Sequence, residues 1–203
     1  MPNLPKPRLR SRSRSRVDAH VQPAAAEPNV EVVEHSGLRW INIERPGPLD
    51  RAWLEEHFEF HPLDYEDVSS RNQRPKIDEY DDYLFIVLHF PVFDKKIGRL
   101  NQGELDIFVG PDYLITLPNT ELKHVEYLFE RLRANDEMRE QVMAQGAGYL
   151  LYRIVDNGFD YCFPMLSKMG NKLDRIETDI FEGRSPQANR PPTPTKDLVC
   201  HDR

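Results

Sequence analysis

Cysteine and long apolar runs are both scarce in this sequence, and each scarcity excludes a class of protein. Only two of the 203 residues are cysteines. Cys162 and Cys200 lie far apart and match no metal-ligand spacing, so both are interpreted as reduced thiols in a cytoplasmic protein. The longest apolar run, at 83–93, is well short of the roughly 20 residues that a membrane-spanning helix needs. We therefore expect that the chain as given does not cross a bilayer.

Common catalytic motifs are absent as well. The sequence has no glycine-rich phosphate loop, no nucleophile elbow and no paired CxxC motif. These absences favour a protein that is not an enzyme. A metal-dependent hydrolase that uses His61, Glu66 and Asp67 is an alternative, although no convergent set of polar residues accompanies them.

Charge is unevenly distributed along the chain. Residues 1–16 carry six basic side chains and no acid; removing these six positive charges from the net charge of −7 leaves −13 for the rest. An acidic body of this kind repels nucleic acid and attracts cations. Residues 1–29 have little to bury and are predicted to form a disordered basic arm. An arm that binds RNA or anionic lipid is a second alternative, but no specific nucleic-acid partner is expected.

The centre of the chain alternates between apolar and polar residues, as strands do. A strand, a turn at Ser36-Gly37 and a second strand that covers 38–43 are predicted first. A meander follows, in which residues 94–103 form a turn. Its strands are predicted at 84–93, 104–109 and 113–117. The acidic residues before the meander are interpreted as a solvated strand entrance; they are Asp78, Glu79, Asp81 and Asp82.

Helical features mark four further segments. Asp50 is predicted to cap a short helix over 51–58, and a second short helix begins at Pro62, whose missing N–H suits a first helical position. Apolar spacing predicts a helix at 121–132 and a longer one at 149–181. The longer helix would measure roughly 50 Å, and Pro164 should kink or divide it. Its apolar stripe calls for partner helices that the sequence does not supply.

Together these elements predict an α/β fold. We expect a three-layer α/β/α domain over residues 30–184, with a mixed, largely antiparallel sheet and long C-terminal helices. The basic arm precedes this domain, and a proline-rich, disordered tail at 185–203 follows it.

Two adjacent acids, Glu66 and Asp67, are the first candidate site residues. On a helix they point about 100° apart, so they do not form an acid–base pair by themselves. They either complement the helix dipole or bind a hard cation such as Mg²⁺, which needs only one or two carboxylates with retained waters. His57 and His61 have a zinc-like spacing, but a helix break is expected between them.

Several motifs occur in a specific order along the chain. WINI lies at 40–43 and YLLYRIVDNGFDYCFPML at 149–166. Between them lie His61-Pro62-Leu63, Glu66-Asp67, Gln73-Arg74-Pro75-Lys76, Tyr80, Tyr83 and FIVL at 85–88. In type and order these motifs closely resemble the cytoplasmic domain of CorA-type magnesium transporters. The resemblance covers about residues 38–184.

The resemblance implies a funnel-forming α/β/α domain of a pentameric channel, with acidic residues that sense cytoplasmic Mg²⁺ at subunit boundaries. By position, Asp67 resembles the main sensor carboxylate. Glu66 and Asp156 resemble a secondary acidic site, and Asp160 lies nearby on the same long helix. The implied ligand is Mg²⁺, with Co²⁺ or other divalent cations as further candidates, and the implied location is the cytoplasmic face of the cell membrane.

The sequence departs from the family in its missing stalk helix, membrane helices and Gly-Met-Asn pore motif. We therefore expect a soluble, truncated Mg²⁺-sensing domain of a CorA-type divalent-cation transporter that cannot transport ions alone. It should self-associate weakly rather than form a tight pentamer. Attachment to the membrane would require C-terminal helices that this sequence lacks. A free-standing regulatory or binding module derived from that domain is the main alternative.

Overall fold

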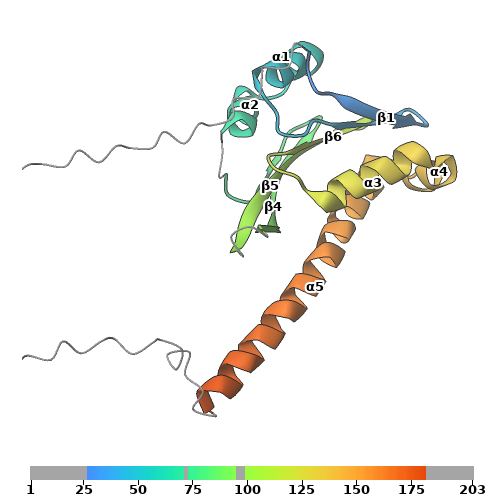
Figure 1. Cartoon of the computed structure of the whole chain (residues 1–203). Coiled ribbons are helices and arrows are strands. Elements are labelled where there is room, and N and C mark those ends of the chain that lie inside the picture. The colour runs from blue at the N-terminus through green and yellow to red at the C-terminus, as the bar shows by residue number, and fades with distance from the viewer. Residues whose placement is uncertain (1–26, 71–72, 95–98, 182–203) are drawn as a thin grey trace, which may run out of the picture.

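A six-stranded sheet forms the centre of the molecule (Figure 1). The computed structural model describes residues 27–70, 73–94 and 99–181. Nearly all of the predicted basic arm and the whole predicted tail lie outside the described residues. The strands are β1 (Glu31–His35), β2 (Leu38–Asn42), β3 (Lys76–Glu79), β4 (Leu84–Asp94), β5 (Arg99–Val109) and β6 (Tyr113–Pro118).

The strands are arranged in the order β1-β2-β6-β5-β4-β3. β2 and β6 run parallel, and every other neighbouring pair runs antiparallel. The tight turn between β1 and β2 is formed by Ser36 and Gly37, whose φ angles of 51° and 81° lie in the left-handed region that glycine adopts readily. The predicted mixed, largely antiparallel sheet is confirmed.

Helices cover both faces of this sheet (Figure 1). On one face, apolar side chains from α1 and α2 join β4, β5 and β6 in a first core. On the other face, α3, α4 and α5 enclose a second core, which includes Trp40 and Phe129 with their rings in edge-to-face contact. The three-layer prediction is therefore confirmed. The helices are α1 (Pro48–His57), α2 (Pro62–Ser69), α3 (Lys123–Ala134), α4 (Asp136–Met143) and α5 (Ala147–Phe181).

Alternation along β5 decides which side chains face α2. Leu105 and Ile107 belong to the core under α3–α5, and Phe108 belongs to the core under α1–α2. Because successive residues of a strand point to opposite faces, Glu104 and Asp106 lie on the same side as Phe108. The sheet thus carries two buried carboxyl groups toward the α1–α2 layer.

Two predictions about the meander are wrong. Residues 99–103 are the start of β5, not part of a turn, because each of them pairs with a residue of β4 and its backbone is satisfied despite the polar side chains. Asp78 and Glu79 are not an irregular segment before the strand that begins at Leu84. They belong to β3, which pairs antiparallel with β4 at the edge of the sheet.

The start of α1 also differs from the prediction. Gly47 is the N-cap residue and Pro48 begins the helix, which places Asp50 at the third helical position. The Asp50 carboxylate accepts hydrogen bonds of 2.7 Å from the backbone N–H groups of Gly47 and Asn29. Asp50 therefore stabilises the helix start from inside the first turn, as an acid does in a capping box.

α5 is a single helix of 35 residues, which corresponds to about 52 Å. Pro164 does not divide it. Because proline has no N–H, the carbonyl of Asp160, four residues earlier, lacks its helix hydrogen bond. The Asp160 side chain is exposed, so water can reach this carbonyl and replace the bond. No helix among the described residues is long and apolar enough to span a bilayer.

The two halves of α5 have different surroundings. The first half packs on the sheet, and Gly158 lies so close to the Phe90 ring that an added Cβ would be 2.3 Å from it. The second half extends beyond the sheet (Figure 1) and leaves its apolar side chains exposed. These form the distal α5 stripe: Phe159, Phe163, Leu166, Met169, Leu173, Ile176, Ile180 and Phe181.

Candidate metal centre

α2 is a two-turn helix whose start is fixed by His61 and Pro62. The His61 Nδ1 accepts a hydrogen bond of 3.3 Å from the Leu63 N–H, and Pro62 occupies the first helical position as predicted. Tyr65 and Val68 are buried against the sheet and hold the helix in place. Because α2 is anchored at its cap and on one face, the directions of its acidic side chains are set.

Asp64, on the buried face of α2, is the most enclosed acid of this layer at 1% exposure. Its two oxygens accept hydrogen bonds from the hydroxyls of Tyr80 at 3.0 Å and Tyr83 at 2.7 Å. Burial raises the pKa of both tyrosines, and their hydrogen bonds to the carboxylate raise it further. The tyrosines therefore remain protonated donors, and they hold the Asp64 carboxylate in a fixed position.

Lys76 joins Asp67 of α2 to Asp78 of β3. Its Nζ lies 2.6 Å from Asp67 Oδ2 and 2.5 Å from Asp78 Oδ2. Burial alone would lower the pKa of Lys76, but the hydrogen bonds and charges of the two carboxylates outweigh it and the pKa is raised. An ammonium group with this pKa is a permanent cation between the two acids at neutral pH.

The three carboxylates form one acidic group. Each acid contributes one carboxylate oxygen, and these three oxygens lie within 4.8 Å of one another; the acids are Asp64, Asp67 and Asp78. Hard oxygen ligands in this number suit Mg²⁺, which keeps several of its waters when it binds proteins. Two of these three carboxylates, of Asp67 and Asp78, are the ones that contact the Lys76 ammonium.

Comparison with protein families identifies the family to which the chain belongs. A family model described as "CorA-like Mg2+ transporter protein" matches residues 35–190, which is more than half of the chain. The chain belongs to the CorA-like Mg²⁺ transporter family. The family expected from the sequence motifs is therefore confirmed.

Curated relatives carry names that refer to metal-ion transport. The putative metal ion transporter YfjQ of Bacillus subtilis is 35% identical over 150 residues, which cover 73% of this chain and 44% of that protein. The cobalt/magnesium transport protein CorA of Thermotoga maritima is 30% identical over 146 residues, or 70% of this chain and 40% of that protein. The CorA-like chain thus spans less than half the length of these transporters.

Solved structures share the fold of the CorA-like chain. The soluble domain of CorA from Methanocaldococcus jannaschii matches with a TM-score of 0.61 at 19% identity, over 74% of this chain and 58% of that one. The complete CorA magnesium transporter from the same organism matches with a TM-score of 0.59, also at 19% identity, over 76% of this chain and 47% of that one.

The residues predicted from the sequence do not all lie together in the CorA-like chain. Asp67 belongs to the acidic group, and its neighbour Glu66 is exposed on α2. Asp156 is half-buried and Asp160 exposed, both on α5. Since α2 and α5 cover opposite faces of the sheet, a single chain does not bring Asp156 or Asp160 to Asp67.

Sequence reasoning missed two further carboxyl groups under α2. Glu104 accepts a hydrogen bond of 2.7 Å from the Gln73 N–H. Asp106 is 2% exposed, and its Oδ1 has no hydrogen-bond partner among the described residues. Burial raises the pKa of Asp106 to about 8, with the negative charges of Glu104 and Asp67 adding to the effect. The alternation of ELDIF at 104–108 was the signal that both acids share one face of a buried strand.

A buried histidine lies in the other layer. His124 on α3 is 5% exposed and lies between the rings of Phe90 and Tyr161, at centroid distances of 4.3 and 5.7 Å. Neither ring nitrogen of His124 has a hydrogen-bond partner among the described residues, and burial lowers its pKa to about 4. His124 is therefore neutral at physiological pH.

Proposed function

We propose that this CorA-like domain senses divalent cations, Mg²⁺ above all, at the cytoplasmic face of a CorA-type transporter. The observation that carries the proposal is the group of three carboxylate oxygens, from Asp64, Asp67 and Asp78, within 4.8 Å of one another. The names of the curated relatives, which refer to cobalt, magnesium and metal-ion transport, support the same ion class.

The spacing of the group suits Mg²⁺ with a small adjustment. In octahedral coordination with Mg–O distances of about 2.1 Å, opposite ligands lie about 4.2 Å apart. Oxygens up to 4.8 Å apart reach such an ion after a slight closure, or contact it through its retained waters. Asp64 is held by two tyrosines, so the side chains that adjust are Asp67 and Asp78.

Lys76 sets the range of cation concentration over which the proposed sensor responds. A divalent cation that binds Asp67 and Asp78 must displace the Lys76 ammonium from contacts of 2.6 and 2.5 Å. The protein therefore supplies its own competitor, which weakens binding without removing the site. A weak site changes its occupancy when an abundant ion varies in concentration, as a sensor requires.

Glu66, Asp156 and Asp160 are proposed to act in an assembly of several chains. Within one chain Glu66 and Asp156 are separated by the sheet, so a shared ion needs a neighbouring copy. The distal α5 stripe offers an apolar surface for weak self-association. Sedimentation should detect this association as a concentration-dependent increase in mass, and a strictly monomeric chain at high concentration would contradict it.

Mg²⁺ titration followed by NMR tests the proposed sensor. In the wild type, amide shifts should saturate for residues of α2 and β3. Asp67→Asn should abolish those shifts, because it removes the charge that a hard cation requires. The matched control is Glu56→Gln, which removes one negative charge from an exposed position on α1 and should leave the shifts intact. Shifts that persist in Asp67→Asn would refute the proposal.

A further inference from the structure

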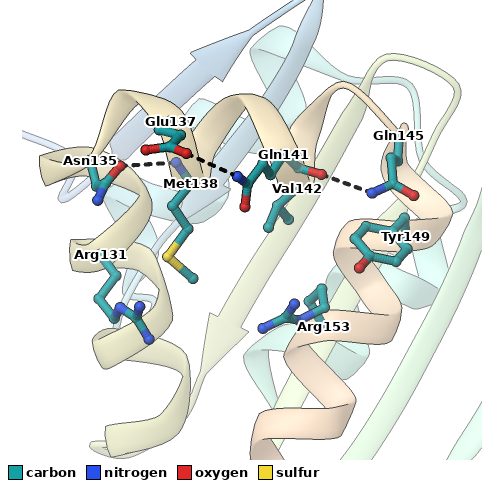
Figure 2. Close-up of a pocket in the computed structure, with 9 residues that line it drawn as sticks. All are labelled: Arg131, Asn135, Glu137, Met138, Gln141, Val142, Gln145, Tyr149 and Arg153. Atoms are coloured by element: carbon teal, nitrogen blue, oxygen red, sulfur yellow. Dashed lines mark hydrogen bonds between the residues drawn. The ribbon is translucent and has the colours of Figure 1, made fainter.

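A polar groove of about 720 Å³ lies between α4, the end of α3 and the start of α5 (Figure 2). It is on the face of the sheet opposite the acidic group. Two of its nine lining residues are arginines, and one is an acid. They are Arg131, Asn135, Glu137, Met138, Gln141, Val142, Gln145, Tyr149 and Arg153.

The two arginines enter this groove from different helices. Figure 2 shows Arg131 on α3 and Arg153 on α5, with their side chains directed into the space between the helices. Neither arginine forms a hydrogen bond or an ion pair with any residue that the structure describes. By contrast, Arg133 and Arg139, in the same layer, pair with Glu31 and Asp136 respectively.

Arg153 has an unmet hydrogen-bonding requirement. Its Nε is buried and donates to no acceptor among the described residues. Of the arginines in the described ranges, Arg153 is the one that is partly buried and has no polar partner. A buried N–H of a guanidinium group without an acceptor is costly, and an anion in the groove would supply that acceptor.

Arg131 is held in a way that leaves its donors available. Its guanidinium lies over the Tyr127 ring, 5.4 Å from the centroid. A cation–π contact of this kind uses the charge of the guanidinium and none of its N–H donors in a hydrogen bond. Arg131 is therefore positioned by the ring without using the donors that would bind a carboxylate or phosphate.

We propose that this groove binds a small organic anion with two or more negative charges, carried by phosphate or carboxylate groups. Arginine binds both groups through paired N–H donors, and two arginines from facing helices can engage two charged groups of one molecule. The volume lies within the roughly 300–1,000 Å³ of small-molecule sites. Met138 and the Tyr149 ring supply apolar surface for the ligand's carbon atoms.

Calorimetric titration with fructose 1,6-bisphosphate tests the proposal, and a second titration with citrate distinguishes phosphate from carboxylate ligands. Both are done without divalent cations, so the result is independent of the proposed Mg²⁺ site. Arg131→Gln and Arg153→Gln should each weaken binding by about tenfold or more, because each loses charge-assisted hydrogen bonds. Glu137→Gln should strengthen binding, since it removes the one negative charge in the lining.

Arg175→Gln is the matched control, because Arg175 is an exposed arginine of the same helix as Arg153 and has no ion pair among the described residues. Its binding should equal that of the wild type. Circular dichroism of each variant verifies that the fold is retained. The proposal is overturned if neither anion binds saturably, if Arg175→Gln weakens binding as much as Arg153→Gln, or if Glu137→Gln alone has an effect.

Discussion

The two faces of the sheet bury different kinds of titratable group. The α1–α2 side buries four carboxyl groups and also holds the cation of Lys76; the four acids are Asp50, Asp64, Glu104 and Asp106. Under α3–α5 lies His124, which has no polar partner among the described residues and is surrounded by rings. The comparison indicates that the α2 face is organised around charge, whereas the core under α3–α5 is apolar around the neutral imidazole of His124.

This difference gives the two faces opposite responses to pH. A buried acid whose pKa is raised keeps its proton to a higher pH in the native state than in the unfolded state. Stability therefore falls as pH rises. A buried histidine whose pKa is lowered takes up its proton at a lower pH in the native state than in the unfolded state. Stability therefore falls as pH drops. Variants at Asp106 and His124 can separate the two contributions.

The largest effect is expected from Asp106→Asn. The pKa of Asp106 is raised from 3.8 to about 8, so the wild type loses stability as pH rises between these values. The neutral asparagine does not. Urea unfolding gives the free energy of unfolding of the variant and of the wild type at each pH. The variant's value minus the wild type's should be about 4 kcal/mol larger at pH 8 than at pH 5.

Asp81→Asn is the control for this prediction, because Asp81 is an exposed acid that precedes β4. A stability change for Asp106→Asn that is equal at pH 5 and pH 8 would mean that Asp106 is ionised in the native protein. The charge-based description of the α2 face would then be wrong.

A somewhat smaller effect of opposite sign is expected from His124. Burial lowers its pKa from 6.5 to about 4. Between these values the unfolded chain binds a proton that the native chain does not, so the wild type should lose about 3 kcal/mol of stability from pH 7 to pH 4. His124→Leu should remove this contribution from the pH dependence. If urea unfolding gave identical pH profiles for both proteins, His124 would not be the buried base described here.

The smallest effect is expected from Asp50→Ala. The Asp50 carboxylate accepts two backbone hydrogen bonds at the start of α1, and loss of such a cap costs about 1 kcal/mol. Because the loss is local to the α1–α2 layer, amide exchange should quicken in α1 and remain unchanged in the first half of α5. Equal acceleration on both faces would show that the layers do not respond separately.

Much of the fold follows from local patterns in the sequence. Alternation predicted β2, β4 and β6 to within one residue of their bounds, and Pro62 predicted the first residue of α2. β3 and the first half of β5 were missed because their residues are mostly polar and become strand only by pairing with β4. α5 was predicted as a long helix, but with a kink or break at Pro164. The helix continues past Pro164 because the region around Asp160 is exposed to solvent, which a sequence pattern does not reveal.

The site was predictable only in part, for a related reason. The resemblance to the CorA family pointed to Asp67, but Asp78 joins it through the pairing of β3 with β4. Asp106 comes from a more distant strand. Such groupings depend on contacts between residues far apart in the chain. They could not be read from neighbouring residues alone.

The most direct test of the account is the Mg²⁺ affinity of Lys76→Gln. If Lys76 and Mg²⁺ compete for Asp67 and Asp78, removing the ammonium should tighten Mg²⁺ binding by about tenfold, the equivalent of one charge-assisted hydrogen bond. Lys123→Gln, which removes an exposed lysine on α3 in the other layer, should leave the affinity unchanged. Calorimetry that finds equal or weaker Mg²⁺ binding in Lys76→Gln would contradict the account.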